Sequence, residues 1–221
     1  MAINHLIIAV DGPAGSGKST LARKIADILG MEYIDTGAMY RALTLKVIEE
    51  GIDPTDEDDV LGLLEETTIT YENNYIYLDG LEVDKKIREN IINKHVSDIA
   101  KIEGVRIKMV ELQRELARSD NVIMDGRDIG TVVLPDANFK FFIVASVEER
   151  ARRRYRELVD RGEPDITYQG ILQGIKDRDR LDSTRQVAPL YKSPDAYEID
   201  TTSKTVDESV TEILNIIRGG K

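Results

Sequence analysis

The sequence predicts an α/β protein with a doubly wound parallel sheet flanked by helices. First, short apolar runs rich in branched residues, such as LIIAV at 6–10, alternate with amphipathic segments of helical length. Second, a glycine-rich run at 12–20 joins that first strand directly to a helix. Third, branched and aromatic residues alternate at 67–83. This pattern predicts a small antiparallel insert within the alternating strands and helices.

The predicted strands and helices alternate along the chain, and Gly or Pro marks several helix ends. The predicted strands lie at 6–10, 31–34, 122–124, 139–145 and 196–200. The predicted helices lie from the glycine-rich run to about 29, at about 38–50, within 52–66, within 85–118, from 147 to a break at Gly162 and Pro164, at about 168–181, and at 206–218. Gly30 and Gly51 are expected to end the first two, and SVEE at 146–149 fits a capping box. In the insert, turns are expected at Asn73-Asn74 and Asp79-Gly80.

Composition excludes several classes of function. The 221 residues include no cysteine, so disulfides, a thiol nucleophile and a cysteine metal site are excluded. His5 and His95 are too far apart in sequence to suggest a metal pair. No apolar run approaches the roughly 20 residues of a membrane span, and the N-terminal residues run straight into a strand without room for a signal peptide. The net charge of -11 argues against nucleic-acid binding. We therefore expect a cytoplasmic protein.

The run at 12–20 fits the phosphate-loop pattern GxxxxGK[ST]. Its backbone N–H groups are expected to point at phosphate oxygens, Lys18 to reach the β- and γ-phosphates, and the Ser19 hydroxyl to hold Mg²⁺. The loop residues expected to bind a nucleoside triphosphate are Gly12, Pro13, Ala14, Gly15, Ser16, Gly17, Lys18, Ser19 and Thr20. The alternative, a chance match in a surface loop, is disfavoured because both flanking elements fit.

Charged residues follow several predicted strands, at the sheet edge where ligands of such folds bind. They are Asp35, Thr36 and Arg41 after the second strand, Asp125, Arg127 and Asp128 after the third, and Arg150, Arg153 and Arg154 after the fourth. One nucleoside triphosphate does not need so many arginines, so we expect a second phosphorylated ligand. The alternative for each arginine is a surface ion pair.

Asp125 closes an apolar strand, as a Mg²⁺-associated acid of a phosphate-loop enzyme does. The alternative is a turn or helix-capping aspartate. The helix carrying Arg178, Asp179, Arg180 and Asp182, followed by Arg185, fits either part of a closing site or a solvated ladder of charges.

Several segments along the chain are specific in sequence: DGPAGSGKST, YIDTGAMYRAL, IREN, HVSDIAKIEGVR, ASVEERARRRY and RDRLDSTRQVAPL, together with GRDIGTVVLPDA at 126–137, which is the most specific. Together they resemble bacterial cytidylate kinases, which are nucleoside monophosphate kinases. The resemblance covers nearly the whole chain. The insert at 67–83 is similar to the extra three-stranded sheet of the bacterial enzymes.

The resemblance implies a role for each matching residue. Thr36, Arg106, Asp128 and Arg185 would surround the cytosine; Ser97, Arg178 and Asp182 would hold the pentose hydroxyls; Arg41 and Arg127 would grip the acceptor phosphate; and Arg150, Arg153 and Arg154 would lie in or beside a lid over ATP. Thr36 stands where some members have Ser, which keeps the hydroxyl.

The resemblance also implies a single kinase with a core at 1–36, 119–150 and 185–221, a monophosphate-binding region at 37–118 and a lid at 151–167. We expect transfer of the γ-phosphate of ATP to CMP or dCMP with Mg²⁺, by a monomer with no nucleic-acid or membrane partner. The alternatives are another small-molecule kinase on this fold, a phosphate-loop GTPase or ATPase switch, and a regulatory protein that has lost catalysis. The switch is disfavoured because no NKxD or TKxD guanine-reading motif is present.

Overall fold

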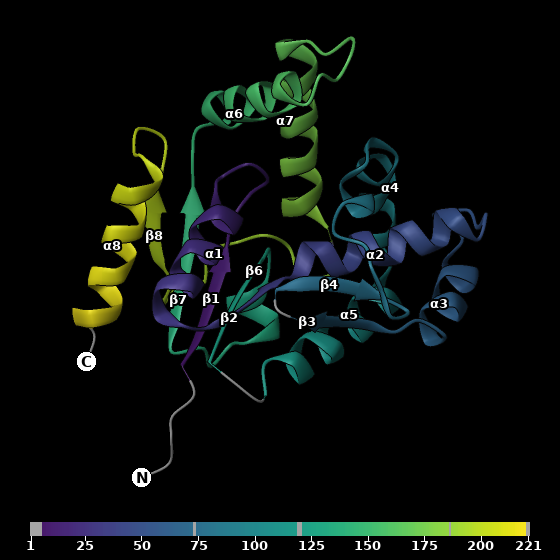
Figure 1. Cartoon of the computed structure of the whole chain (residues 1–221), viewed down its shortest axis with the longest axis horizontal. Helices are drawn as coiled ribbons and strands as arrows, with labels where there is room; N and C mark the ends of the chain where they lie inside the picture. Colours follow the sequence, from purple (N-terminus) through teal and green to yellow (C-terminus); the bar gives the residue numbers. More distant parts are fainter. Residues whose placement is uncertain (1–5, 73, 119–120, 186, 220–221) are drawn as a thin grey trace. The chain divides into compact units, whose positions relative to one another are not determined.

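Two compact units make up the computed structural model (Figure 1). The structure describes residues 6–72, 74–118, 121–185 and 187–219, so His5 and the predicted turn residue Asn73 lie outside the described residues. The first unit comprises Met1–Met31 and Val122–Lys221, and the second comprises Glu32–Asn121. None of the helices within the described residues is long and apolar enough to cross a membrane.

The first unit is built on parallel strands in the order β6-β1-β7-β8. The strands are β1 (Ile7–Asp11), β6 (Val122–Gly126), β7 (Phe139–Val144) and β8 (Tyr197–Asp200). In β1 every residue from Ile8 to Asp11 is buried, which confirms the prediction of a strand covered on both faces. β6 runs to Gly126. The polar Asp125 was expected in the turn that follows the strand, but it belongs to the strand itself.

The α-helices of the first unit lie between and after these strands in the chain order. They are α1 (Lys18–Leu29), α6 (Val147–Asp160), α7 (Tyr168–Thr184) and α8 (Val206–Gly219). α1 packs on β6 and against α8, and α6 packs against α7 (Figure 1). Gly30 ends α1 and the Ser146 hydroxyl caps α6 by accepting from Glu149 N at 3.2 Å, both as predicted. α7 continues to Thr184, past the predicted end near 181, because no Gly or Pro interrupts it there.

A π-helix, η2 (Ile129–Val133), follows β6 and was not predicted. Its wide turns show in the Asp128 carbonyl, which accepts from Val132 N at 2.8 Å and from Val133 N at 3.2 Å. Such turns are rare and are frequent at functional sites.

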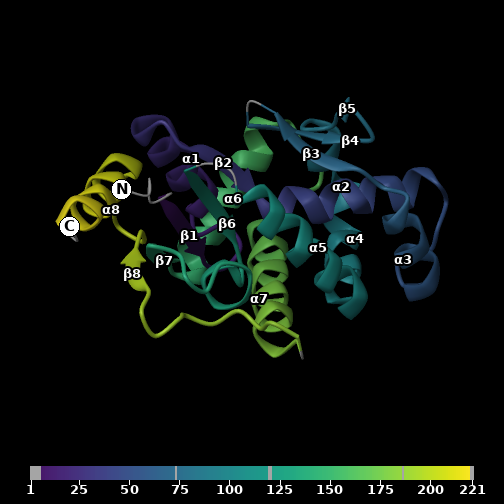
Figure 2. The ribbon, with the colours of Figure 1, turned by 90° about the horizontal axis from the view of Figure 1, so that it is seen from below.

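The second unit holds the antiparallel insert. Its sheet has the order β3-β4-β5, with β3 (Ile69–Glu72), β4 (Tyr75–Leu78) and β5 (Leu81–Glu82) side by side (Figure 2). This confirms the predicted meander, and the second predicted turn has both its residues, Asp79 and Gly80, in left-handed backbone. Asn74 of the first turn is also left-handed.

The remaining elements of the second unit are β2 (Glu32–Asp35), α2 (Thr36–Glu49), α3 (Glu57–Glu65), η1 (Lys86–Arg88), α4 (Asn90–Lys101) and α5 (Glu103–Leu116). α2 begins two residues before the predicted start, because the Asp35 carboxylate accepts from Ala38 N at 3.0 Å and caps it. The segment expected to be helical at 85–118 is divided at Ile102, which is extended. Met39, Leu43, Ile76 and Ile99 are fully buried in the core between the helices and the small sheet.

Candidate active site

The phosphate loop lies between β1 and α1, where the sequence predicted it. Gly12 has φ of +153°, and a Cβ there would lie 2.2 Å from the carbonyl oxygen of Ile143, so only glycine fits beside β7. Lys18 is the first residue of α1, and its side chain is buried. The loop therefore presents N–H groups and one cation at a helix N-terminus, which together attract an anion.

Ser19 and Lys18 meet Asp125 of β6. The Ser19 hydroxyl donates to Asp125 Oδ2 at 2.8 Å, and Lys18 Nζ lies 4.0 Å from the same oxygen. Asp125 is 1% exposed. A hydroxyl and a carboxylate are hard oxygen donors, which suit Mg²⁺ because that ion takes one or two protein oxygens and completes its shell with phosphate and water. The donor set thus fits the predicted metal.

Two arginines of the first unit, Arg127 and Arg154, act on the charge of a third, Arg178. Arg127 Nε donates to Asp182 Oδ2 of α7 at 2.8 Å, and this carboxylate holds the pKa of Arg127 above its ordinary value despite the effect of burial. Burial and then the charges of Arg127 and Arg154 lower the pKa of Arg178 to about 10. The Nε atom of Arg178 is buried and makes no hydrogen bond to any residue that the structure describes. Arg178 is repelled by two neighbouring cations, and its Nε–H donor lacks an acceptor among the described residues. An anionic ligand at this place would relieve both effects.

Asp128 and Arg185 lie side by side in the same unit. Asp128 Oδ1 is 3.7 Å from Arg185 Nη2, and both side chains are largely buried. Arg185 Nε also donates to the Ala188 carbonyl at 2.6 Å. The structure therefore brings together two of the residues that the family resemblance assigns to the cytosine.

Arg150 is committed to protein partners. It is 3% exposed and makes a bidentate pair with Asp179 of α7, at 2.9 and 2.6 Å. It also donates to the carbonyls of Ala14, in the phosphate loop, at 3.1 Å and of Ala145 at 3.0 Å. Arg150 therefore supports the phosphate loop through the carbonyl of Ala14. A direct contact between Arg150 and ATP stays a prediction.

Arg153 and Arg154 of α6 differ in their surroundings. Arg153 Nη2 donates to the Thr201 carbonyl at 2.6 Å, and its Nη1 donates to the Ser16 carbonyl of the phosphate loop at 3.4 Å. Arg154 is paired with Glu157 at 2.8 Å and is partly exposed. Both lie in the same unit as the phosphate loop, as the prediction of donor-side arginines requires, but their contact with ATP also stays a prediction.

The second unit holds the remaining acceptor residues. Arg41 of α2 donates to Asn93 Oδ1 of α4 at 2.7 Å and to the Ile87 carbonyl at 3.4 Å. Arg106 of α5 is 3% exposed and lies over the Tyr40 ring. Thr36 is buried at the start of α2, and Ser97 is half-buried on α4. Their role in binding stays a prediction.

Three supporting residues were missed by the sequence reasoning: Asp11, Asn93 and Asp179. Asn93 holds Arg41 from 52 positions away, and its own amide donates to the Glu89 carbonyl at 3.1 Å. Asp11 holds the η2 turn from 118 positions away. Asp179 was considered as a member of a closing site or of a solvated ladder of charges, but not as the partner of Arg150. No local pattern reveals such contacts, because each depends on the tertiary fold.

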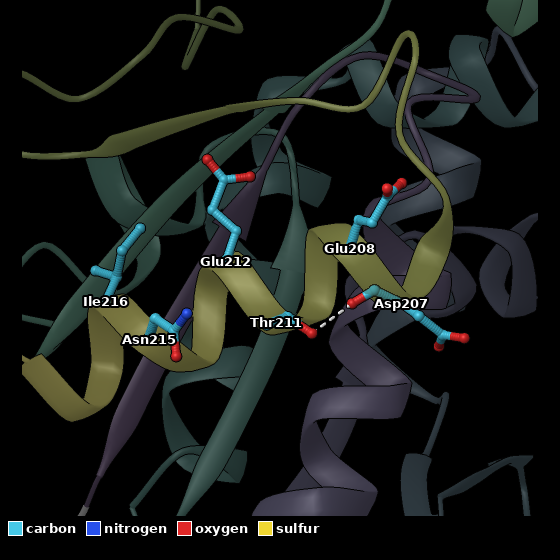
Figure 3. Close-up of a pocket in the computed structure, with 6 residues that line it drawn as sticks. All are labelled: Asp207, Glu208, Thr211, Glu212, Asn215 and Ile216. Atoms are coloured by element: carbon cyan, nitrogen blue, oxygen red, sulfur yellow. Dashed lines mark hydrogen bonds between the residues drawn. The ribbon is translucent and has the colours of Figure 1, made fainter.

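A pocket of about 770 Å³ runs along α8 and is lined by acidic and polar side chains (Figure 3). Asp207 and Glu212 in this lining form ion pairs with Lys24 and Lys204, respectively. Carboxylates repel phosphate groups, so this pocket does not suit a nucleotide.

A phosphate loop at the start of a helix, beside a parallel sheet, is typical of a class of nucleotide-binding proteins. Arginines that could hold a second anion favour the kinases of this class over its switch proteins. Solved kinases share the fold: shikimate kinase from Acinetobacter baumannii in complex with shikimate matches with a TM-score of 0.52 at 20% identity, covering 99% of this chain and 96% of that one. Shikimate kinase from Bacteroides thetaiotaomicron matches with a TM-score of 0.51 at 14% identity, covering 96% and 98%. The chain therefore has the fold of phosphate-loop kinases.

Sequence comparison then gives the family. Residues 8–219 match the model of the cytidylate kinase family. The cytidylate kinase of Clostridioides difficile (strain 630) is 48% identical over 215 residues, which cover 97% of this chain and 99% of that relative. The cytidylate kinase of Caldanaerobacter subterraneus subsp. tengcongensis is 51% identical over 211 residues, covering 96% and 94%. The chain belongs to the cytidylate kinase family.

Proposed function

We propose that this protein transfers the γ-phosphate of ATP to CMP or dCMP and produces ADP with CDP or dCDP. The match to the cytidylate kinase family over nearly the whole chain carries the proposal. The cluster of Arg127, Arg154 and Arg178 supports it, because these cations suit a second phosphorylated ligand beside the one in the phosphate loop. The proposal takes a cytoplasmic monomer as the working form.

The reaction needs no general base. The acceptor phosphate has a second pKa of about 6, so its oxygens are already ionised near pH 7. One such oxygen attacks the γ-phosphorus in line, a new P–O bond forms, and the bond between the γ-phosphorus and the β–γ bridging oxygen breaks, which leaves the electron pair on ADP. Catalysis then rests on positioning and on charge neutralisation.

The first unit supplies the groups for the donor. The N–H groups of the phosphate loop and Lys18 would hold the β- and γ-phosphates, and Arg153 and Arg154 would approach the transferring group from α6. Ser19 and Asp125 would hold Mg²⁺, which supplies neutralisation of the triphosphate charge when bound. Removing one group that stabilises the transition state typically costs about 2.7–4 kcal/mol, so Lys18→Ala should lower kcat by about 100- to 1,000-fold in a protein that stays folded.

The acceptor residues are divided between the units. Arg127, Asp128, Arg178, Asp182 and Arg185 belong to the first, and Thr36, Arg41, Ser97 and Arg106 to the second. Arg41 and Arg127 would aim the phosphate, Ser97 with Arg178 and Asp182 would hold the pentose, and the others would surround the base. Asp128 can accept from the amino group of cytosine, whereas it would repel the carbonyl that uracil carries at the same position.

The experiment is ADP release from MgATP with CMP, dCMP, UMP, AMP or GMP supplied singly, together with a control without acceptor. We expect ADP with CMP and dCMP, matched by CDP and dCDP. ADP in equal amounts without acceptor would mean a hydrolase, and ADP with a different monophosphate alone would mean another kinase of the same fold.

A further inference from the structure

A carboxylate at the end of β1 holds the turn that follows β6. Asp11 Oδ1 accepts from Ile129 N at 2.8 Å, and Asp11 Oδ2 accepts from Gly130 N at 2.8 Å. These N–H groups come directly after Arg127 and Asp128 in the chain. Asp11 itself immediately precedes Gly12, so one side chain joins the start of the phosphate loop to the turn that carries an arginine and an aspartate of the acceptor site.

The donors of these bonds belong to the first turn of η2. The first N–H groups of any helix have no partner within the helix, and they need an acceptor from elsewhere when they are buried. Asp128 precedes the helix in the capping position but does not cap it with its own side chain. Asp11 supplies that cap from the neighbouring strand, so the side chain of Asp128 can be directed elsewhere.

Gly130 packs between Asp11 and the side chain of Lys140 in β7. A Cβ at this position would lie 3.1 Å from Cδ of Lys140 and 3.4 Å, an ordinary contact distance, from Asp11 Oδ2. The first turn of η2 is therefore closely packed against both side chains. Both hydrogen bonds have nearly ideal donor–acceptor distances, which indicates a defined position for the backbone that follows Arg127 and Asp128.

We propose that Asp11 is a positioning residue of the acceptor site. By capping the first turn of η2, it fixes the position of Arg127 and Asp128, which directly precede that helix. The inference rests on the proposed function, because Arg127 and Asp128 are there assigned to the phosphate and base of CMP. Asp11 touches neither nucleotide and acts through the turn.

The cost of placing a carboxylate here supports a role other than stability. Asp11 is 5% exposed, and burial raises its pKa to about 7, more than its backbone hydrogen bonds lower it. Asp128 of the turn also raises this pKa, whereas Arg127 lowers it. A buried carboxyl group with a strongly raised pKa and specific hydrogen-bond partners is a candidate for a functional role.

The test is Asp11→Asn, which keeps the size of the side chain but replaces one acceptor oxygen by a donor. The amide NH₂ then opposes a backbone N–H group, so the turn must shift. We expect the Kd for CMP, measured by calorimetry, and the KM for CMP to rise by about tenfold or more, while the Kd and KM for MgATP change less than about threefold. The ratio of kcat/KM for CMP over UMP should also fall, because Asp128 moves with the turn.

Two control variants separate positioning from general destabilisation. Asp53→Asn changes a carboxylate that also accepts a backbone N–H, from Thr55 at 2.9 Å, but in an exposed loop of the second unit. Ile213→Val lowers stability from α8, where Ile213 is fully buried. Both should keep the wild-type constants for CMP and MgATP.

Equal weakening of CMP and MgATP in Asp11→Asn, weakening of MgATP alone, or no change would each overturn the inference. A loss for CMP that Ile213→Val reproduces at a matched Tm would overturn it as well. Wild-type protein that neither binds nor phosphorylates CMP would instead overturn the proposed function, so the two failures are distinguishable.

Discussion

Asp128 is the residue from which base selectivity should follow. It is buried beside Arg185, so a mismatch at its carboxylate is not relieved by water. A misplaced buried polar group costs about 1–3 kcal/mol, so we expect CMP to be preferred over UMP by about tenfold or more. Asp128→Asn should narrow that ratio, because an amide can both donate and accept. Steady-state kcat/KM values for the two acceptors measure it.

The matched control for this variant is Asp136→Asn, an exposed position shortly after the same turn. It should leave the CMP/UMP ratio at the wild-type value. A ratio that Asp128→Asn does not change would remove Asp128 from base recognition.

Asp11 should also show in the pH dependence of stability. Its pKa is about 7 in the folded protein and 3.8 in the unfolded chain, so the folded state binds the proton more tightly. The contribution of Asp11 to stability is thus fully present below the unfolded pKa and is lost as the pH rises through about 7. Between pH 5 and pH 8, wild type should lose on the order of 2 to 3 kcal/mol relative to Asp11→Asn.

Urea denaturation of both proteins at each pH measures this difference. Arg127 and Asp128, which also act on Asp11, are present in both proteins and cancel to first order. Asp53→Asn should show a flat difference over the same range, since the pKa of Asp53 is lowered by its hydrogen bonds to Thr55 and both states are ionised there. A flat difference for Asp11→Asn would mean that its carboxyl is not perturbed by burial.

Single residues were predictable from sequence where a motif fixes them. Lys18 and Ser19 stand in fixed places of the phosphate loop, and Asp125 closes an apolar strand, so their meeting follows from the motif and from a parallel sheet. Asp11 and Asn93 were not predictable, because their hydrogen-bond partners are chosen by tertiary packing. Arg150 was predictable as a residue near the site, but its hydrogen bonds to the Ala14 carbonyl and to Asp179 were not.

Among the elements, α6 is joined to α7 by an ion pair and to the phosphate loop by hydrogen bonds. Arg150 of α6 binds Asp179 of α7 and the Ala14 carbonyl at once, and its side chain is 4% exposed. Asp179→Ala would leave this charge buried without its counter-ion. Breaking a buried pair costs about 3–5 kcal/mol, and because Asp179 is 24% exposed we expect about 2–4 kcal/mol here. The free energy of unfolding in urea measures it.

Asp177→Ala is the matched control on the same helix. Asp177 lies 3.7 Å from Arg180 in an exposed pair, which contributes about 0–1 kcal/mol. Equal losses of unfolding free energy in the two variants would show that the Arg150–Asp179 pair stabilises the fold no more than an exposed ion pair does.

At this scale the sequence predicts elements well where their ends carry chemical markers. Gly30 and the SVEE capping box define ends of α1 and α6, and alternation defines the small sheet. The π-helix was missed because its wide turn is stabilised by Asp11 from another strand, not by a local pattern. The break at Ile102 was missed because apolar residues continue on both sides of it.

For the whole molecule, two phosphorylated ligands should stabilise the fold separately. At about 100 times its Kd, one ligand that binds only the folded state adds about 2.7 kcal/mol. We expect a non-hydrolysable ATP analogue with Mg²⁺ to raise the Tm, and CMP to raise it further when added second. Thermal unfolding monitored by circular dichroism measures both shifts.

Lys18→Ala is the informative variant here. It should lose much of the shift from the ATP analogue and keep the shift from CMP, because Lys18 belongs to the phosphate loop alone. A protein in which CMP gives no shift under any condition would contradict the reasoning from the arginines to a second ligand.

The α/β class and its parallel sheet were predictable because buried branched runs at regular intervals leave few other architectures. The division into units was harder to predict from sequence. It depends on which buried residues share a core, and periodicity alone does not assign a helix to one core or another.

The second unit interrupts the first in the chain, and this order has a consequence for protein synthesis. β1 and the phosphate loop leave the ribosome early, but their partners β6, β7 and β8 are translated only after the whole of Glu32–Asn121. The second unit has its own core, and its two ends are joined by a hydrogen bond from Glu32 N to the Asn121 carbonyl at 2.9 Å. The small sheet β3-β4-β5 and the helical core beside it can therefore form while the nascent strand β1 still lacks its neighbours. During that interval the apolar β1 segment has no strand beside it, and exposed apolar surface with unpaired strand edges is prone to aggregation.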